Sequence, residues 1–361
     1  MEPHPPAASA HANGATPAPP LSVIRASDLS PAEWSALNAV ANDWYATPGH
    51  CLLYAHEPAE WVALWRDRCG TPLAACFWTP ARWLRRFRVL KLAGPTTATP
   101  AMLKTLLKRQ RAGMLSIPYC EGTGPASPLP WWQSRTSPHE PDWIIPLPAS
   151  LGQYMDSLGR TSRRHLAAYA RRLENQLHPN LVVQERAQIQ PELLAELIEL
   201  HRQRMANAGK NFWLTPAKIE RRIRLAHECG LFCGRLVDGR LIGGTLNFCH
   251  GSTATLSLVA HDPRHDALHC GLVCLLDTIE QLIATGFKTY NLHFRYSPFK
   301  PRLGGVEHPY HQTDLFSNPA MAVLRNGWAW KKKARGLSRY LGHFENAVAD
   351  KGSGKGVAPI V

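Results

Sequence analysis

Two hydrophobic periodicities alternate along the second half of the chain. Strand-like patterns are predicted at residues 181–185, 231–237, 241–250, 253–260, 289–294 and 310–316. Helical spacing appears instead at residues 192–205, 216–229 and 268–285. Asp238-Gly239 and the triplet His250-Gly251-Ser252 leave room only for tight turns, so the second, third and fourth strands form an antiparallel meander. This order of elements predicts an α+β fold with mixed, mostly antiparallel sheets flanked by helices.

Shorter elements are predicted in the first half. Strands are expected at residues 21–25, 51–54, 72–78, 87–92, 114–117 and 142–147. Helices are expected at residues 30–45, 57–68 and 99–111, and the first opens with the capping-box sequence Ser30-Pro31-Ala32-Glu33. Residues 1–20 are rich in Pro and Ala, which predicts a disordered leader.

A long basic helix is predicted over residues 151–177. Leu158, Leu166 and Leu173 lie on its apolar side, whereas arginines fill the polar side. We interpret residues 148–178 as a bridge between an N-terminal domain, residues 21–147, and a C-terminal domain, residues 179–318. Residues 319–361 are then expected to form a basic, aromatic tail helix with a flexible end.

Composition narrows the partners and the compartment. The formal net charge of +14 favours an anionic partner, although a basic surface that only keeps the protein soluble is an equal alternative. Nine scattered cysteines without a CxxC pair indicate free thiols in a reducing compartment. The leader is not a signal peptide, and no apolar stretch is long enough to span a membrane. We therefore expect a cytoplasmic protein.

Three stretches of the sequence resemble a known family. They are the arginine-rich segment 162–174, the hairpin 238–246 with its glycine pair, and residues 262–304, which end in an aromatic-Lys loop and a glycine. In order and spacing they resemble the GNAT acyltransferases, and most closely the branch with CelD-like exopolysaccharide proteins and FemAB-type aminoacyltransferases. The resemblance covers residues 150–318 and implies tandem GNAT-like units, of which the N-terminal one is degenerate.

The resemblance implies acetyl-CoA or another acyl-CoA as co-substrate. A loop that enters a helix N-terminus offers free N–H groups and a positive dipole end to a pyrophosphate. Residues 264–271 occupy that junction, and the expected cofactor-binding residues are Arg264, His269, Cys270 and Gly271. His261, His265 and His269 have the spacing of a metal-binding helix face, but Pro263 interrupts such a helix, so no metal is expected.

Acylation of an amine or hydroxyl also needs a base for the acceptor and an acid for the leaving thiolate. The candidates at the ends of predicted strands are His261, His293 and Tyr296. His293 is the expected base and Tyr296 the expected acid, with a buried core histidine as the alternative for His293. Substrate binding is expected of Arg163, Arg164 and Lys300, and the alternative for the two arginines is a solvated helix face.

The acceptor implied by the resemblance is an anionic sugar or cell-envelope precursor. The expected activity is therefore that of an N- or O-acyltransferase, most specifically an acetyl-CoA-dependent N-acetyltransferase. Residues 325–340 would allow peripheral contact with an anionic membrane at the inner face, or pack on the protein itself.

Two alternatives stay open. One is a FemAB-like transferase that takes its amino acid from aminoacyl-tRNA, the only reading that involves nucleic acid. The other is an inactive GNAT scaffold that binds a protein partner.

Overall fold

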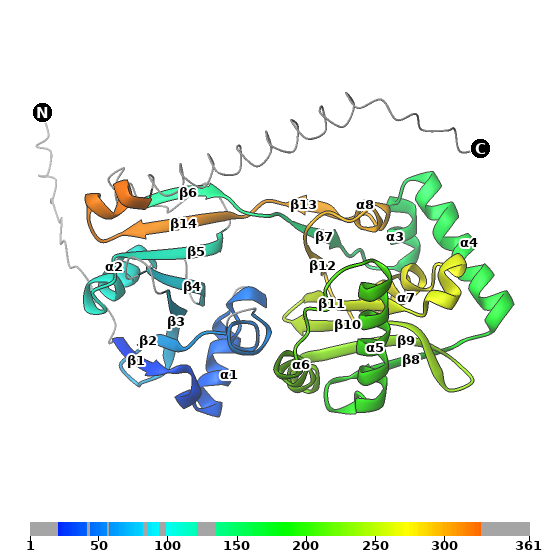
Figure 1. Ribbon diagram of the computed structural model, residues 1–361, viewed down its shortest axis with the longest axis horizontal. Coiled ribbons are helices and arrows are strands. Elements are labelled where there is room, and N and C mark those ends of the chain that lie inside the picture. Colours follow the sequence, from blue (N-terminus) through cyan, green and yellow to red (C-terminus); the bar gives the residue numbers. More distant parts are fainter. Residues whose placement is uncertain are drawn as a thin grey trace, which may run out of the picture.

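The computed structural model describes residues 21–41, 44–55, 58–81, 86–93, 99–120 and 134–325. The predicted leader, residues 1–20, and all of the tail after Arg325 lie outside the described residues. Two seven-stranded sheets stand side by side and carry helices on their faces (Figure 1). Within the described residues, no helix combines the length and apolar character needed to cross a membrane.

The first sheet has the strand order β1-β2-β3-β4-β5-β14-β6. Its strands are β1 (Leu21–Arg25), β2 (Trp61–Arg66), β3 (Pro72–Ala81), β4 (Arg86–Ala93), β5 (Met114–Cys120), β6 (Ser134–Pro138) and β14 (His311–Phe316). The helical elements of this half are η1 (Ala26–Asp28), α1 (Pro31–Val40), η2 (Trp44–Ala46), η3 (Gly49–Tyr54, a π-helix) and α2 (Thr99–Arg109).

The second sheet has the order β8-β9-β10-β11-β12-β7-β13. Its strands are β7 (Asp142–Pro146), β8 (Asn180–Glu185), β9 (Gly230–Val237), β10 (Arg240–His250), β11 (Thr253–His261), β12 (Thr289–Phe294) and β13 (Val306–His308). Its helices are α3 (Leu151–Ser157), α4 (Arg160–Leu177), η5 (Arg186–Gln188), α5 (Pro191–Asn207), α6 (Pro216–Cys229), η6 (Pro263–Leu268), α7 (Cys270–Ala284) and α8 (Phe299–Arg302).

The two sheets repeat one plan. Each contains an antiparallel meander followed by a helix and then a parallel strand, β3-β4-α2-β5 in the first and β10-β11-α7-β12 in the second. All other strand pairs are antiparallel. The fold is therefore α+β with two units of the same plan, as the sequence predicts.

The two sheets exchange strands. β7 precedes the second meander in sequence but pairs with β12 and β13, whereas β14 returns to the first sheet and pairs with β5 and β6. The sheets therefore do not follow the expected boundaries at residues 147 and 318. A pattern of apolar residues identifies a strand but not its neighbour, so an exchange of this kind leaves no local signal.

Two local predictions in the first half are wrong. Residues 51–54 belong to the helix η3, and much of the predicted helix 57–68 is the strand β2. β2 lies between β1 and β3, and Val62, Ala63, Leu64 and Trp65 are all buried there. A strand buried on both faces carries a continuous apolar run, which is easily mistaken for a helix.

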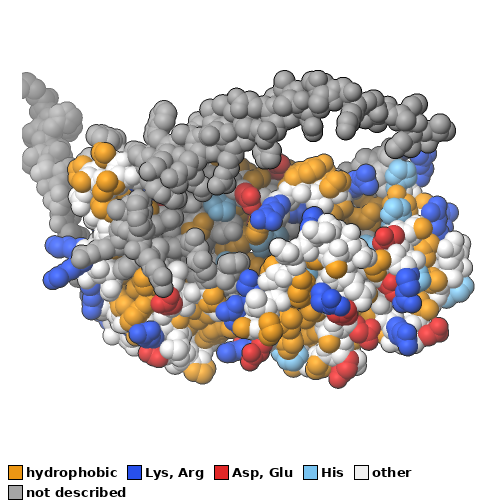
Figure 2. All heavy atoms as spheres, in the orientation of Figure 1, with side chains coloured by type: hydrophobic (Ala, Val, Ile, Leu, Met, Phe, Trp, Pro, Cys, Tyr) orange, Lys and Arg blue, Asp and Glu red, His pale blue; other side chains and the backbone are white. Residues whose placement is uncertain are grey.

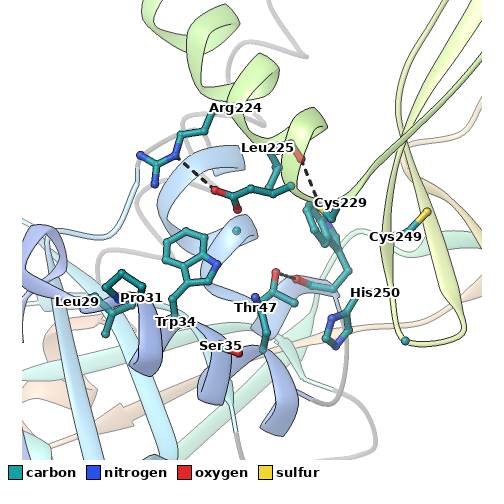
Figure 3. Close-up of a pocket in the computed structure, with 15 residues that line it drawn as sticks. Leu29, Pro31, Trp34, Ser35, Thr47, Arg224, Leu225, Cys229, Cys249 and His250 are labelled. Carbon is teal, nitrogen blue, oxygen red and sulfur yellow. Dashed lines mark hydrogen bonds and ion pairs between the residues drawn. The ribbon is translucent and has the colours of Figure 1, made fainter. Parts of the chain in front are cut away.

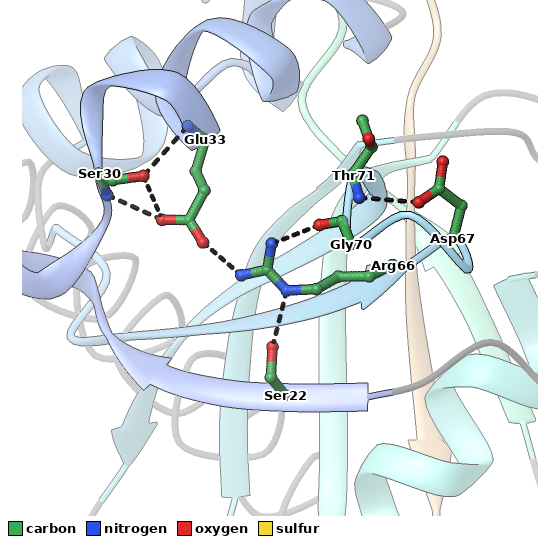
Figure 4. Close-up of polar contacts among 7 residues, drawn as sticks. All are labelled: Ser22, Ser30, Glu33, Arg66, Asp67, Gly70 and Thr71. Atoms are coloured by element: carbon green, nitrogen blue, oxygen red, sulfur yellow. Dashed lines mark hydrogen bonds and ion pairs between the residues drawn. The ribbon is translucent and has the colours of Figure 1, made fainter.

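The predicted capping box does form and links α1 to the sheet. The Ser30 hydroxyl accepts a hydrogen bond from the backbone N–H of Glu33, and the Glu33 carboxylate accepts one from the backbone N–H of Ser30. Arg66 on β2 pairs with the same carboxylate and donates to the Gly70 carbonyl at 2.9 Å (Figure 4).

The predicted basic helix is divided at residues 158–159 into α3 and α4.

Candidate functional site

The strands β11 and β12 pair over only three residues. Thr253, Ala254 and Thr255 pair in parallel with residues 289–291, and β11 then continues to His261 without a partner on that side. The unpaired edge offers backbone N–H and C=O groups to an extended ligand. We call this opening, formed by β11 residues 256–261 and the end of β12, the notch.

A β-bulge lies where the notch begins. On β10, Leu246 pairs with Leu258 and Asn247 with Leu256, so Ser257 is the extra residue of β11. The hydroxyl oxygens of Thr255 and Ser257 are buried without a partner among the described residues. Bulges are common beside active sites because they redirect a strand and release its ladder groups. Sequence reasoning missed both residues, since a bulge is visible only in the strand register.

The loop predicted to hold the cofactor leads from the notch into α7. The side chain of Asp262 accepts a hydrogen bond from the backbone of Arg264, and His269 takes a left-handed conformation directly before α7. The first N–H groups of α7 have no acceptor within the helix. The expected residues Arg264, His269, Cys270 and Gly271 therefore do gather at one helix N-terminus.

These four residues differ in what they offer a ligand. Arg264 folds back onto Asp262, with Nε–O distances of 2.9 and 3.1 Å, while its side chain stays 76% exposed. Cys270 is buried, which raises the pKa of its thiol to about 11 and keeps it protonated. Gly271 allows the His261 ring to lie close, because a Cβ at residue 271 would be 3.0 Å from His261 Nδ1.

Positive charge surrounds this helix end. Burial, together with the nearby charges of Arg172 and Arg302, lowers the pKa of His269, whose ring lies 3.9 Å from that of Tyr169. His261 Nε2 lies 2.6 Å from a carboxylate oxygen of Asp266. Lys and Arg side chains also gather along the edge of the molecule formed by α4 (Figure 2). The free N–H groups of this helix end, with Arg172 and Arg302 nearby, are therefore the candidates for holding a phosphorylated group, although Asp262 and Asp266 already pair with Arg264 and His261.

The three predicted catalytic residues have different surroundings. His261 contacts Asp266 and Gly271, whereas the His293 ring packs against those of Tyr45 and Tyr54. Tyr296 is 68% exposed and packs against Trp143. Burial and the charges of His50, Lys300 and Arg222 lower the pKa of His293 to about 3. A histidine with this pKa is neutral at pH 7 and a weak base.

Of the residues predicted to bind substrate, Lys300 requires a correction. The sequence places it at the rim of the cleft, but it is 5% exposed. Its Nζ donates to the backbone carbonyls of His293, Phe294 and Arg295 at 2.7–2.8 Å. His293 and Arg295 have positive φ angles of 68° and 67°. The Lys300 ammonium group supplies hydrogen bonds to the backbone carbonyls of this turn. Lys300 therefore shapes the end of β12.

The two predicted arginines of α4 lie elsewhere. Arg163 forms an exposed ion pair with Asp156 at 2.7 Å, and Arg164 is exposed on the same helix. Their expected role in substrate binding therefore stays a proposal.

A buried carboxyl group next to the notch was not predicted. Asp142, at the start of β7, is fully buried, and its Oδ2 accepts hydrogen bonds from Tyr45 at 2.5 Å and from Asn291 at 2.7 Å. Burial raises the pKa of Asp142, although these hydrogen bonds and the charges of Lys300 and His308 oppose the shift. Tyr45 and Asn291 are 97 and 149 residues away in sequence, so only the exchange of β7 between the sheets brings the group together.

A separate pocket of about 560 Å³ lies between α1, the C-terminal end of α6 and the turn that joins β10 to β11 (Figure 3). Its lining includes Trp34, Trp44, Leu225, Glu228 and His250. None of the predicted site residues lines it, so the pocket and the notch are different features. Among the described residues, no group of three His, Cys, Asp or Glu side chains could hold a metal ion.

One family model matches the part of the chain that contains these features. The model of the acetyltransferase (GNAT) domain matches residues 160–301, which include the notch, the loop and α7. No curated protein sequence matched the chain.

Several solved structures share the fold. FemX has 11% identity and a TM-score of 0.60, with 84% of this chain and 99% of FemX covered. L-PGS from Bacillus licheniformis has 13% identity and a TM-score of 0.56, with 82% and 94% covered. The C-terminal domain of a protein from Agrobacterium fabrum, assigned as a lysylphosphatidylglycerol synthetase, has 11% identity and a TM-score of 0.55, with 82% and 95% covered. At these identities the likeness shows the fold alone. Residues 160–301 therefore match the acetyltransferase (GNAT) domain, and they lie within a fold of two sheets that exchange strands.

Proposed function

We propose that the protein transfers an acyl group, most specifically an acetyl group, from acyl-CoA to an amino or hydroxyl group of an anionic acceptor. The observation that carries this proposal is the notch: β11 leaves β12 after three pairs, at a bulge, beside the basic N-terminus of α7. The extended arm of an acyl-CoA would pair with the free edge of β11. Its pyrophosphate would face the first turn of α7.

Arg264 and the backbone of residues 269–271 would bind the donor. His261, His293 and Tyr296 stay proposed catalytic residues, and Arg163 and Arg164 stay proposed acceptor contacts. Because the pKa of Asp142 is raised, we add this carboxyl group as a candidate for proton transfer. By resemblance, the acceptor is a sugar or a cell-envelope or exopolysaccharide precursor. Its modification would take place in the cytoplasm or at the inner membrane face, with residues 325–340 as the proposed membrane contact.

A thermal-shift titration with acetyl-CoA, longer acyl-CoAs and free CoA tests the donor. A ligand held at 100 times its dissociation constant stabilises a fold by about 2.7 kcal/mol. We expect Arg264→Ala to weaken the shift and Lys288→Ala to leave it unchanged, because Lys288 is exposed at the opposite end of β12. If no CoA species shifts the unfolding temperature, the acyl-CoA proposal is wrong.

One observation favours a second donor. The loop holds a single glycine at α7, Gly271, which lies under the His261 ring, and Arg264 is already paired with Asp262. Aminoacyl-tRNA would then replace acyl-CoA, as in the FemAB-like alternative. Salt-sensitive binding of aminoacyl-tRNA in the absence of any CoA response would support this donor. If the protein binds neither a CoA species nor aminoacyl-tRNA, the alternative of an inactive GNAT scaffold is favoured.

A further inference from the structure

Three basic side chains are buried together on α5 and α6. Arg222 is 4% exposed and His201 is 5% exposed, and Arg204 is partly buried beside them. Arg204 Nη2 lies 3.3 Å from His201 Nδ1. The Nε atoms of both arginines and Nε2 of His201 are buried without a hydrogen-bond partner among the described residues.

Aromatic rings surround Arg222. Its guanidinium carbon lies 4.7 Å from the ring centre of Tyr54 and 4.6 Å from that of Trp213. Arg222 also forms a side-chain hydrogen bond with Tyr54, and these contacts stabilise the cation but leave its charge in place. Within the part of the chain that the structure describes, no ion pair joins Arg222 or Arg204 to a carboxylate.

Buried positive charge without a counter-ion is costly. Taking an ion out of water is unfavourable unless a partner of opposite charge compensates for the lost hydration. Groups that break this rule are expected at functional or strained sites. Two guanidinium groups and an imidazole offer several N–H donors at one place, which suits the oxygens of a dianion better than a single carboxylate.

The group lies where the two halves of the molecule meet. α6 packs against η3, which comes from the first half and carries Tyr54. Arg222 also lies close enough to His293, at the end of β12, to affect its protonation. A ligand bound here would therefore lie near the notch, on the side from which an acceptor could approach.

We propose that Arg222, Arg204 and His201 form a binding site for a phosphate group between α5, α6 and η3. Trp213, on the segment that joins α5 to α6, borders the site and is 41% exposed. The assignment of this phosphate to the acceptor rests on the acyl transfer proposed above. The proposal of a phosphate site does not depend on that function.

Isothermal titration of the full chain with inorganic pyrophosphate tests the site. We compare Arg222→Met with Arg224→Met, because Arg224 is exposed on the same helix and pairs with Glu228. We expect Arg222→Met to weaken binding at least tenfold and Arg224→Met to leave it unchanged. Equal binding by the wild type and Arg222→Met, or no binding by the wild type, would overturn the proposal.

The stability of the ligand-free protein separates a binding role from a structural one. If Arg222 awaits an anion, methionine removes an unpaired buried charge, and the unfolding temperature of Arg222→Met stays the same or rises. A marked fall would show that Arg222 holds the fold through its aromatic contacts, which contradicts the proposal.

His201 provides a readout at the site. Burial and the charges of Arg204 and Arg222 lower its pKa to about 4 in the free protein. A bound pyrophosphate should raise this pKa in the wild type, measured by NMR, and not in Arg222→Met. An unchanged pKa at saturating pyrophosphate would place the anion elsewhere, for example at α7.

Two further measurements identify the molecule that carries the phosphate and separate failure of the phosphate site from failure of the acyl-transfer proposal. Displacement of pyrophosphate by UDP indicates a nucleotide-linked acceptor, and displacement by phosphatidylglycerol vesicles indicates a lipid-linked one. Displacement by neither would overturn the assignment to the acceptor. The acetyl-CoA shift should be the same in Arg222→Met as in the wild type. If acetyl-CoA shifts the unfolding temperature of neither protein, the acyl-CoA proposal is contradicted, whereas the proposed phosphate site is not.

Discussion

Individual side chains near the end of β12 carry an unusual excess of positive charge. Lys300 is buried by its three carbonyl contacts, and burial lowers its pKa to about 8. His293 lies close to this ammonium, to His50 and to Arg222, and Nε2 of its ring is buried without a partner among the described residues. The region therefore resists a further proton.

His293 should make stability depend on pH. Its pKa in the folded protein, about 3, is below the ordinary value of 6.5, so the unfolded chain binds a proton first as the pH falls. The contribution is present above pH 6.5 and is lost as the pH falls towards 3. Between pH 7 and pH 5 the wild type should lose about 2 kcal/mol more unfolding free energy than His293→Gln.

Urea denaturation at the two pH values measures this difference. His165→Gln, which changes an exposed histidine on α4, is the control and should follow the wild type. Parallel losses in the wild type and His293→Gln would show that His293 accepts a proton in the folded state, as the expected catalytic base would.

Among the elements, α4, α7 and β9 are joined by one side chain. Arg235 on β9 donates to both carboxylate oxygens of Asp277 on α7 at 2.8 Å and lies 3.1 Å from Glu174 on α4. Asp277 is 7% exposed, and its hydrogen bonds and charge raise the pKa of Arg235 further. This contact fixes the helix whose N-terminus faces the notch.

Replacing Arg235 with methionine should destabilise the protein strongly. The change leaves Asp277 buried without its partner, and loss of one member of a buried pair costs roughly 3–5 kcal/mol. Arg224→Met removes an exposed pair with Glu228 and should cost less than about 1 kcal/mol. Chemical denaturation of the two variants gives the comparison. Equal, small losses would mean that Arg235 contributes little to holding α7.

At the scale of the whole molecule, the exchanged strands make the two halves interdependent. β14 is the second strand from one edge of the first sheet, and β7 holds the corresponding position in the second. Leu315 on β14 is buried in the core of the first half with Trp65, Leu106 and Leu115. Neither sheet is complete without a strand from the other side of the sequence.

Thermal unfolding should therefore occur in a single transition. Leu315→Ala removes buried apolar volume and should cost about 2–5 kcal/mol. Calorimetry is expected to show one transition that moves as a whole to lower temperature. Two transitions, of which only one moves, would show that the halves unfold independently. Val323→Ala, at an exposed position after β14, is the control and should change little.

The sequence by itself determined the elements whose signals are local. The Ser30 capping box, the Asp238-Gly239 turn and the meander of the second half all appear where the pattern predicts them, because their periodicity and turn chemistry act over a few residues. The resemblance of three sequence stretches to the GNAT acyltransferases is confirmed by the family model that matches residues 160–301.

Only the tertiary structure decided the rest. Pairing of β7 and β14 across the two sheets, the bulge at Ser257 and the contact of Tyr45 with Asp142 all depend on residues far apart in sequence. Burial then set the protonation of His293 and the position of Lys300, since an ionisable group responds to the solvent and charges around it. The sequence shows which groups are present, and packing determines which of them face water, one another or a bound anion.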